Sequence, residues 1–213
     1  MTYCITFLGA PGSGKGTQAE KLSQELGIKK FSIGDIIRDE VVKNTELGNK
    51  VQPYIEAGNL VPDNLIIDIF KDKANSVSNE KGFISDGFPR NKDQAEALDN
   101  IINHNDIKVL MLEVKLEDVK ERLLGRQVCG SCKSIYHKIN SPSKIKNICD
   151  SCGSELKTRK DDTPEIIENR FKVYMDSITP LINYFEGRII KINAAQSSDE
   201  VFKSILENIE WLQ

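Results

Sequence analysis

Short apolar segments alternate with segments in which apolar residues recur at helical spacing along most of this chain. Apolar runs of this kind are typical of buried strands in a parallel sheet, and the helical segments are typical of the connections between them. We predict five strands, over residues 3–8, 30–33, 82–86, 108–114 and 188–193. The pattern therefore predicts an α/β fold with one three-layer core, built on a five-stranded parallel sheet.

Two of the predicted helices carry end signals. The first begins at Lys15 and ends before Gly27, because glycine readily adopts the left-handed conformation common after a helix. A later helix begins at Thr163-Pro164, with Thr as N-cap and Pro at the first helical position. Between Gln127 and Lys160 both the helical and the strand patterns fail, so we predict an irregular insertion there.

Composition limits the kinds of ligand. The chain has 213 residues, 39% of them hydrophobic, which suffices for the core of one large domain. Its net charge of −3 argues against a nucleic-acid-coating surface, so we expect a small phosphorylated ligand and no nucleic-acid partner. No apolar run is long enough to span a membrane, and no basic segment precedes the N-terminal strand. We therefore expect a cytoplasmic protein with no membrane partner. We also expect a monomer, since nothing in the sequence suggests an assembly interface.

A glycine-rich run, Gly9 to Thr17, directly follows the first predicted strand. Such a run turns backbone N–H groups toward a phosphate, and the following helix points its positive dipole end at the same anion. Lys15 adds a charge on a flexible stem, and Gly16 stands where this motif usually has Ser or Thr. A turn that only joins strand to helix is the alternative. We predict a P-loop that binds nucleotide through Gly12, Ser13, Gly14, Lys15, Gly16 and Thr17.

Arginine is scarce, since only seven of the 29 basic residues are Arg. A planar guanidinium can grip phosphate through two hydrogen bonds, which Lys cannot do. Arg90 follows a predicted strand at the sheet edge where parallel sheets bind ligands. Arg122 and Arg126 share one helix face at one edge of the insertion, and Arg159 lies at its other edge. For any single Arg the alternative is a surface ion pair.

The insertion contains two CxxC pairs, separated by 16 residues, with the cysteines at Cys129, Cys132, Cys149 and Cys152. This spacing is typical of a tetrahedral zinc site, and four thiolates leave no open position for chemistry. We therefore predict a structural Zn²⁺, with a redox-active pair as the alternative. We expect Cys4 to be a buried core residue and His137 to pack in the insertion without binding metal.

Several segments together resemble the adenylate kinase family along nearly the whole chain. They are GAPGSGKGTQ (9–18), Gly34-Asp35 with Arg38, LVPD (60–63), DGFPR (86–90) with Gln94, GRQVC (125–129), and TRKDD (158–162) with Arg170. The resemblance implies reversible transfer of the terminal phosphoryl group of ATP to AMP, with Mg²⁺ as cofactor. It also implies a core over 1–31, 62–126 and 161–213, a monophosphate-binding flap over 32–61, and a zinc-bearing lid over 127–160.

The resemblance assigns roles to individual residues. Lys15, Arg90, Arg126, Arg159 and Arg170 would act in catalysis. Arg122 and Arg126 would bind ATP together with the P-loop, and Asp86 would hold Mg²⁺ through water molecules. The residues expected to bind AMP are Ser32, Arg38, Val61, Gly87, Arg90 and Gln94. The resemblance also implies a cis peptide bond at Phe88-Pro89. Because the acceptor phosphate is already ionised at neutral pH, we expect catalysis without a general base.

Two positions depart from the family pattern. Ile33 stands where adenine-specific members usually have Thr, and it offers no side-chain hydrogen bond to a base. Gln94 offers an amide suited to an adenine edge, so AMP is the expected acceptor, with UMP or CMP as the alternative. Gln127 replaces an Arg of many relatives, which lowers the charge of the lid.

Two other classes of protein fit the sequence less well. A GTPase switch is disfavoured because the Asp of Asn91-Lys92-Asp93 falls one position early for a guanine-reading motif. A zinc-ribbon module that binds nucleic acid is disfavoured by the acidic charge balance.

Overall fold

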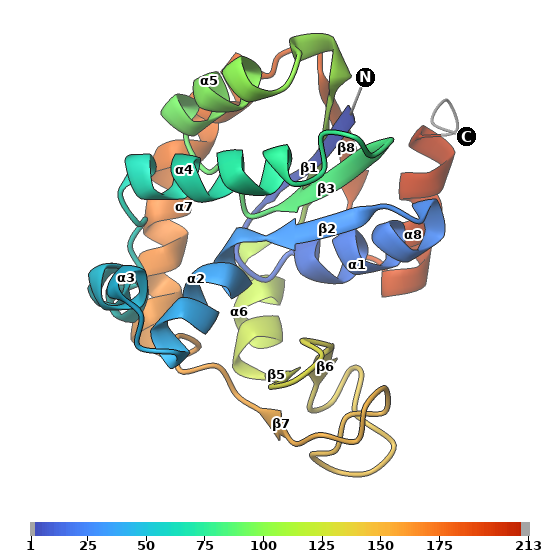
Figure 1. Ribbon diagram of the computed structural model, residues 1–213. Helices are drawn as coiled ribbons and strands as arrows, with labels where there is room; N and C mark the ends of the chain where they lie inside the picture. Colours follow the sequence, from blue (N-terminus) through green and yellow to red (C-terminus); the bar gives the residue numbers. More distant parts are fainter. Residues whose placement is uncertain (1–2, 210–213) are drawn as a thin grey trace.

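The computed structural model describes residues 3–209 and contains the predicted parallel sheet (Figure 1). The strand order is β2-β3-β1-β4-β8, and every neighbouring pair is parallel. These strands are β1 (Tyr3–Gly9), β2 (Lys29–Ser32), β3 (Gly82–Asp86), β4 (Ile107–Glu113) and β8 (Ile189–Asn193). The five predicted strands and the α/β fold class are therefore confirmed. Residues 1–2 and 210–213, at the ends of the predicted core segments, lie outside the described residues.

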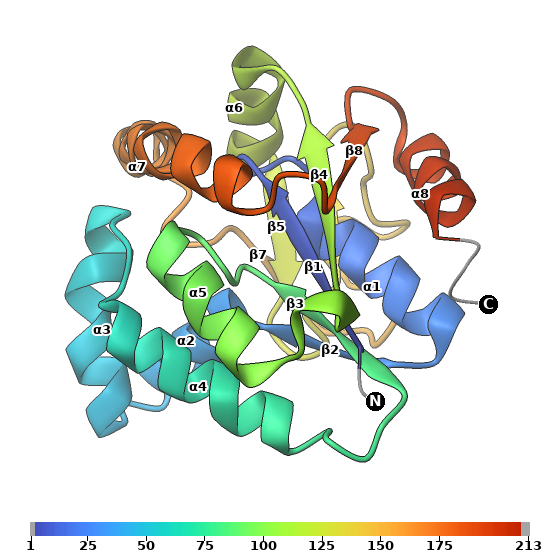
Figure 2. The same ribbon diagram turned by 90° about the horizontal axis from the view of Figure 1, so that it is seen from above.

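Alternate residues of the strands face two separate hydrophobic layers. Cys4 and Leu8 of β1 pack on one face, and Ile5 and Phe7 pack on the other. Figure 2 shows the sheet between these layers. The first face is covered by α4 (Asp63–Asn75), α5 (Lys92–Ile101) and α7 (Pro164–Tyr184), and the second by α1 (Lys15–Leu26) and α8 (Ser198–Asn208). Burial on both faces explains why these strands read as continuous apolar runs.

The helix ends agree with their sequence signals. Helix α1 ends at Leu26, and Gly27 adopts the left-handed conformation with φ 62°. Helix α7 begins at Pro164 after Thr163, whose side chain accepts a hydrogen bond from Ile166 N. The remaining core elements are α6 (Leu116–Leu124) and a short 3₁₀ turn, η1 (His104–Asp106). None of the helices within residues 3–209 combines the length and the apolar character needed to cross a bilayer.

One predicted strand end is wrong. Ile33 was expected to close the second strand, but it is the first residue of α2 (Ile33–Val42). The cause lies in Ser32, whose side chain accepts a hydrogen bond from Asp35 N and so caps the helix one residue earlier. Helices α2 and α3 (Glu46–Ala57) pack against each other and lie to one side of the core in Figure 1.

The insertion is more regular than its sequence suggests. It contains a three-stranded antiparallel sheet, in the order β6-β5-β7, that lies below the core in Figure 1. The strands are β5 (Arg126–Cys129), β6 (Ile135–His137) and β7 (Leu156–Lys157). The prediction of an irregular segment is corrected here. Strands of two to four residues are too short to produce a readable alternation of polar and apolar positions.

Candidate active site

The glycine-rich loop connects β1 to α1 at the carboxyl edge of the sheet and borders a cavity of about 910 Å³. Gly12 has φ 81°, and a Cβ atom there would lie 2.7 Å from Val119 Cγ1. A side chain at this position would be strained and would collide with α6, so the loop requires glycine. All six predicted P-loop residues line the cavity, namely Gly12, Ser13, Gly14, Lys15, Gly16 and Thr17.

The Lys15 side chain folds back onto this loop. Its Nζ donates hydrogen bonds to the backbone oxygens of Gly9 and Ala10, both at 2.7 Å. Burial lowers the pKa of Lys15 to about 7, and the nearby Asp86 carboxylate only partly opposes this effect. An anion placed at the loop would restore the preference for the charged amine, so the loop and its lysine suit a phosphate ligand.

Arginines from separate parts of the chain converge on the same cavity. Together with Lys15 we call them the cationic cluster: Arg38 from α2, Arg90 after β3, Arg126 at the start of β5, Arg159 after β7 and Arg170 from α7. Thus the structure brings together all five predicted catalytic residues, along with Arg38. Arg188, the one Arg without a predicted role in the site, instead pairs with Asp99 at 2.9 Å.

Three aspartates hold the arginines in place. Arg126 makes a two-pronged contact with Asp162, with Nε at 2.8 Å and a terminal nitrogen at 2.6 Å from the two carboxylate oxygens. Arg170 lies 3.3 Å from an oxygen of Asp161 and of Asp162. Asp35 accepts from Arg38 at 2.6 Å and from Arg159 at 3.1 Å.

The cluster nevertheless retains an excess of positive charge, because four arginines share these three carboxylates. Burial and the like charges of Arg38 and Arg126 lower the pKa of Arg159 to about 9. Burial likewise lowers the pKa of Arg170 to about 10, although Asp161 opposes the change. Crowded and desolvated cations of this kind are stabilised by a polyanionic ligand.

Asp86 ends β3 beside the P-loop. A Cβ atom on Gly16 would lie 3.2 Å from Asp86 Oδ2 and 3.3 Å from Ile135 Cδ1 of the insertion. A side chain at this position would therefore be tightly confined between Asp86 and the insertion. The close approach also places a carboxylate next to the phosphate loop, and a single carboxylate combined with phosphates and water suits Mg²⁺.

A second, smaller cavity of about 60 Å³ lies next to the flap. Ile33 lines it together with five of the six predicted AMP-binding residues, namely Arg38, Val61, Gly87, Arg90 and Gln94. Ser32 lines the larger cavity instead. The turn that precedes Arg90 has the predicted cis Phe88-Pro89 bond, and Phe88 O accepts hydrogen bonds from the hydroxyls of Thr6 and Ser85 at 2.7 and 2.8 Å.

Arg122 also lines the larger cavity. One of its terminal nitrogens donates to Ala194 O at 3.1 Å, just before α8 begins. The guanidinium and the loop of residues 194–198 border the cavity near the P-loop. A flat cation in this position suits contact with an aromatic base.

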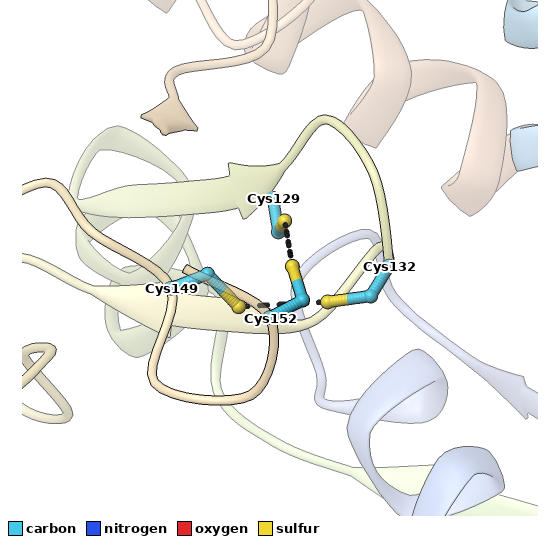
Figure 3. Close-up of side chains that lie close together, drawn as sticks. All are labelled: Cys129, Cys132, Cys149 and Cys152. Carbon is cyan, nitrogen blue, oxygen red and sulfur yellow. Dashed lines mark hydrogen bonds between the residues drawn. The ribbon is translucent and has the colours of Figure 1, made fainter. Parts of the chain in front are cut away.

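The four cysteines of the insertion form a compact group (Figure 3). Their sulfur atoms all lie within 4.8 Å of one another, and the two closest pairs, at 3.5 Å, are Cys129 with Cys152 and Cys132 with Cys149. Each of these close pairs joins one cysteine from each CxxC motif, whereas a redox-active disulfide would join the two cysteines of one motif. A tetrahedral zinc with bonds of about 2.3 Å needs sulfur separations of about 3.8 Å, so the group fits zinc.

His137 and Cys4, the two residues expected to pack without a role in chemistry, are both buried. His137 is buried, and its Nδ1 accepts from the backbone N–H groups of Ile139 and Asn140, so it packs in the lid apart from the sulfurs. Cys4 is fully buried in the core, as expected. Gln127 donates to Asn147 Oδ1 at 2.9 Å within the lid.

Several residues of the site were not predicted. Asp161 and Asp162 hold Arg170 and Arg126, and the TRKDD segment contained the signal, since acidic residues beside a buried Arg are candidates for its partners. Asp63 accepts hydrogen bonds from Asn91 and Gln94. Lys133 of the lid contacts Asp39 of the flap at 2.6 Å, and no local sequence pattern links these two distant positions.

A parallel sheet with a P-loop after its first strand, and arginines collected around one cavity, defines the class of P-loop phosphotransferases. The family model for adenylate kinase matches residues 7–190. Relatives named adenylate kinase occur in Methanocella arvoryzae, 44% identical with 98% of this chain and 99% of the relative covered, and in Lachnospira eligens, 41% identical with 95% and 98% covered. The chain belongs to the adenylate kinase family. It is a nucleoside monophosphate kinase, an ATP:AMP phosphotransferase.

Proposed function

We propose that the cationic cluster holds ATP and AMP with their phosphates facing each other, so that the terminal phosphoryl group passes directly between them. The observation that carries this proposal is the convergence of guanidinium groups from the flap, the core and the lid on one cavity. Two polyanions repel each other, and interleaved cations offset that repulsion while fixing the reacting atoms in line.

The donor would lie along the P-loop. Backbone N–H groups from Gly12 to Thr17 and the amine of Lys15 would bind the ATP phosphates, and Arg122 would cover the adenine. The acceptor would lie against the flap, with its phosphate between Arg38 and Arg90. Ser32, Val61, Gly87 and Gln94 would surround the rest of AMP. Both cavities have the linings that these assignments require.

The chemical step needs charge stabilisation more than proton transfer. Arg90, Arg126, Arg159 and Arg170 would contact the moving phosphoryl group, whose charge spreads over three oxygens in the transition state. Asp86 would hold Mg²⁺ through water, and the ion, when bound, neutralises charge on the ATP phosphates. Lid and flap would close over both nucleotides and exclude water, which prevents wasteful hydrolysis; adenylate kinase lids are an established example of such closure.

The proposed domain organisation assigns residues 1–31, 62–126 and 161–213 to the core, 32–61 to the flap and 127–160 to the lid. Cys129, Cys132, Cys149 and Cys152 would hold a structural Zn²⁺ in the lid, which fits the compact sulfur group. The Tyr136 hydroxyl, 3.5 Å from Cys149 Sγ, lowers the pKa of that thiol to about 6 and favours the thiolate that zinc requires.

The enzyme would act as a monomer in the cytoplasm. Every proposed phosphate contact comes from one chain, so no second copy is needed to complete the site. Cysteines gathered into a metal-binding group are typical of a reducing compartment.

Initial rates with ATP and Mg²⁺ against AMP, CMP, UMP and GMP test the acceptor assignment. We expect turnover with AMP to exceed turnover with the other three acceptors by at least ~10²-fold in kcat/KM, because the Gln94 amide pairs with the adenine edge. Preference for CMP or UMP would instead identify a pyrimidine-monophosphate kinase. GTP binding without turnover of any monophosphate would overturn the proposal.

A further inference from the structure

We propose that Asp63 is a positioning residue that locks the Gln94 amide in one orientation and so selects a 6-amino purine over a 6-oxo purine. The inference rests on the proposed function, in which Gln94 reads the acceptor base. It concerns a residue outside the phosphate machinery, at the first position of α4.

Both ends of the Gln94 amide are already engaged. Its Oε1 accepts a hydrogen bond from Arg90 N at 2.8 Å, and its Nε2 donates to Asp63 Oδ1 at 2.6 Å. The residue is only 1% exposed, so little water is at hand to replace either partner. An amide held from two sides in a buried position has one orientation, provided that its two partners distinguish oxygen from nitrogen.

The partners do distinguish them. A carboxylate only accepts hydrogen bonds, and a backbone N–H only donates. If the amide rotated by half a turn, its NH₂ group would face the Arg90 N–H and its oxygen would face the Asp63 carboxylate. Two hydrogen bonds would be exchanged for two repulsive contacts in a buried site, where unsatisfied polar groups are costly.

Asp63 is itself held in place by a second amide. Asn91 Nδ2 donates to both carboxylate oxygens, at 3.0 and 3.1 Å, while Asn91 Oδ1 accepts from Gln94 N at 2.9 Å and caps α5. The carboxylate thereby bridges the start of α4 to the start of α5. Its position relative to Gln94 is fixed by the Asn91 side chain, which is itself held by the backbone N–H of Gln94.

The locked amide has one N–H and one oxygen lone pair left for a ligand. Gln94 lines the small cavity beside the flap. Adenine has an acceptor at N1 and a donor at its 6-amino group. N1 can therefore accept from the Gln94 N–H while the 6-amino group donates to the Gln94 oxygen. Hypoxanthine and guanine present a donor at N1 and an acceptor at O6, which is the reverse order. An amide free to turn would accept both kinds of base, whereas a locked one accepts adenine.

Other groups in this cavity contribute little to the choice. Ile33 has no hydrogen-bonding side chain, and Asn59 Oδ1 accepts from Asn169 at 2.8 Å. Arg38 and Arg170 are engaged by Asp161 at 3.8 and 3.3 Å. With Ile33 in place of a polar residue, the distinction between 6-amino and 6-oxo bases therefore depends on how Gln94 is oriented.

Asp63→Ala tests the lock. The readout is the ratio of kcat/KM for AMP to kcat/KM for inosine monophosphate, which differs from AMP at the edge in question. We expect this ratio to fall by about tenfold or more, as for the loss of one hydrogen bond to a charged group. Asp63→Asn, whose amide can offer either an oxygen or an NH₂ group to Gln94, should give at least about a threefold fall. If the Ala variant does not fold, the Asn variant provides the test of the Asp63 role.

Two further variants separate the possible failures. Asn91→Ala removes the cap of α5 and the two hydrogen bonds that hold the Asp63 carboxylate, but it leaves the Gln94–Asp63 bond possible, so it should lower thermal stability and lower the ratio less than Asp63→Ala does. A larger fall in Asn91→Ala than in Asp63→Ala would overturn the specific role of Asp63. If Gln94→Ala lowers the ratio and neither Asp63 variant does, the lock is wrong and the base-reading role stands. If Gln94→Ala leaves the ratio unchanged, the base-reading role fails, and the inference with it.

Discussion

At the scale of single residues, the site depends on where a Lys-rich chain uses Arg. Arg90 has its Nε hydrogen bonded to Gly87 O at 2.9 Å, which orients the guanidinium and leaves its terminal nitrogens for phosphate. Arg126 is fixed against Asp162, whose side chain is fully buried. A Lys in either position would keep the charge but lose the second prong and the anchoring bond.

Arg90→Lys should therefore lower kcat by at least ~10²-fold, by analogy with the loss of one oriented charge-stabilising donor. The matched control is Arg188→Lys, since Arg188 lies outside the cluster, pairs with Asp99 and packs over the Phe185 ring at 4.7 Å. The control should change stability more than kcat. A near-normal kcat for Arg90→Lys would show that the planar group is not required.

The ion pairs of Asp35 predict how the stability of the protein changes with pH. Burial by itself raises the pKa of its carboxyl, but Arg38 and Arg159 outweigh burial and hold that pKa at about 2, below the ordinary 3.8. The unfolded chain therefore binds this proton more tightly, so the stabilisation is complete above about pH 4 and is lost as pH falls through 2. The size of the effect is about 2 kcal/mol.

Urea unfolding between pH 5 and pH 3 checks this, with wild type compared against Asp35→Asn. Wild type should lose more unfolding free energy on acidification than the variant. Loss of zinc at low pH affects both proteins equally, so the difference isolates Asp35. Parallel pH profiles would contradict the assigned ion pairs.

At the scale of elements, the lid is a small sheet that has little apolar core of its own. Its buried cluster consists of Cys129, Cys149 and Leu156, with Tyr136 packed against them. Because so little apolar surface is buried, we expect a metal bound by the four cysteines to supply much of the stability of the lid. The sulfur group joins the β5 end of the lid to the loop before β7.

Purified enzyme should contain about one zinc per chain, and Cys132→Ser should lose most of it. Amide hydrogen exchange should then rise throughout residues 127–160 while the core strands stay protected. Cys4→Ala is the control, since Cys4 is buried in β1 and should leave the zinc content unchanged. Metal-free enzyme with an equally protected lid would contradict the structural role.

The elements also show how far the sequence alone leads. The P-loop, the two faces of the sheet and the cap at Thr163 were predictable because each depends on residues close together in the chain. The short lid strands were not, since their pairing is set by the turns between the cysteines. The arginines of the site were predictable through the family resemblance. The carboxylates that orient these arginines, and the Asp63 bond to Gln94, depend on contacts between distant segments.

At the scale of the whole molecule, lid and flap touch each other directly. Arg159 of the lid contacts Asp35 of the flap at 3.1 Å, and Lys133 contacts Asp39 at 2.6 Å. The first pair uses a cluster arginine, whereas the second joins two partly exposed side chains, of which Lys133 also borders the larger cavity. The two pairs link the segments that would close over the two nucleotides.

Lys133→Glu should weaken this link and raise the KM for both nucleotides about two- to fivefold, because an exposed ion pair contributes at most about 1 kcal/mol. Adding Asp39→Lys restores opposite charges and should restore KM. High salt should reduce the difference between wild type and Lys133→Glu. Initial rates at two salt concentrations measure this, and an unrescued double variant would rule out a direct charge contact.

The central claim is direct transfer of a phosphoryl group between two nucleotides held by one cluster of cations. ATP labelled at its terminal phosphorus, incubated with AMP, Mg²⁺ and the enzyme, tests it most directly. The account predicts that the label appears in the ADP formed from AMP, one for each ATP consumed, with almost none as free phosphate. Label released as inorganic phosphate at the rate of ATP consumption, or never found in a diphosphate, would contradict it.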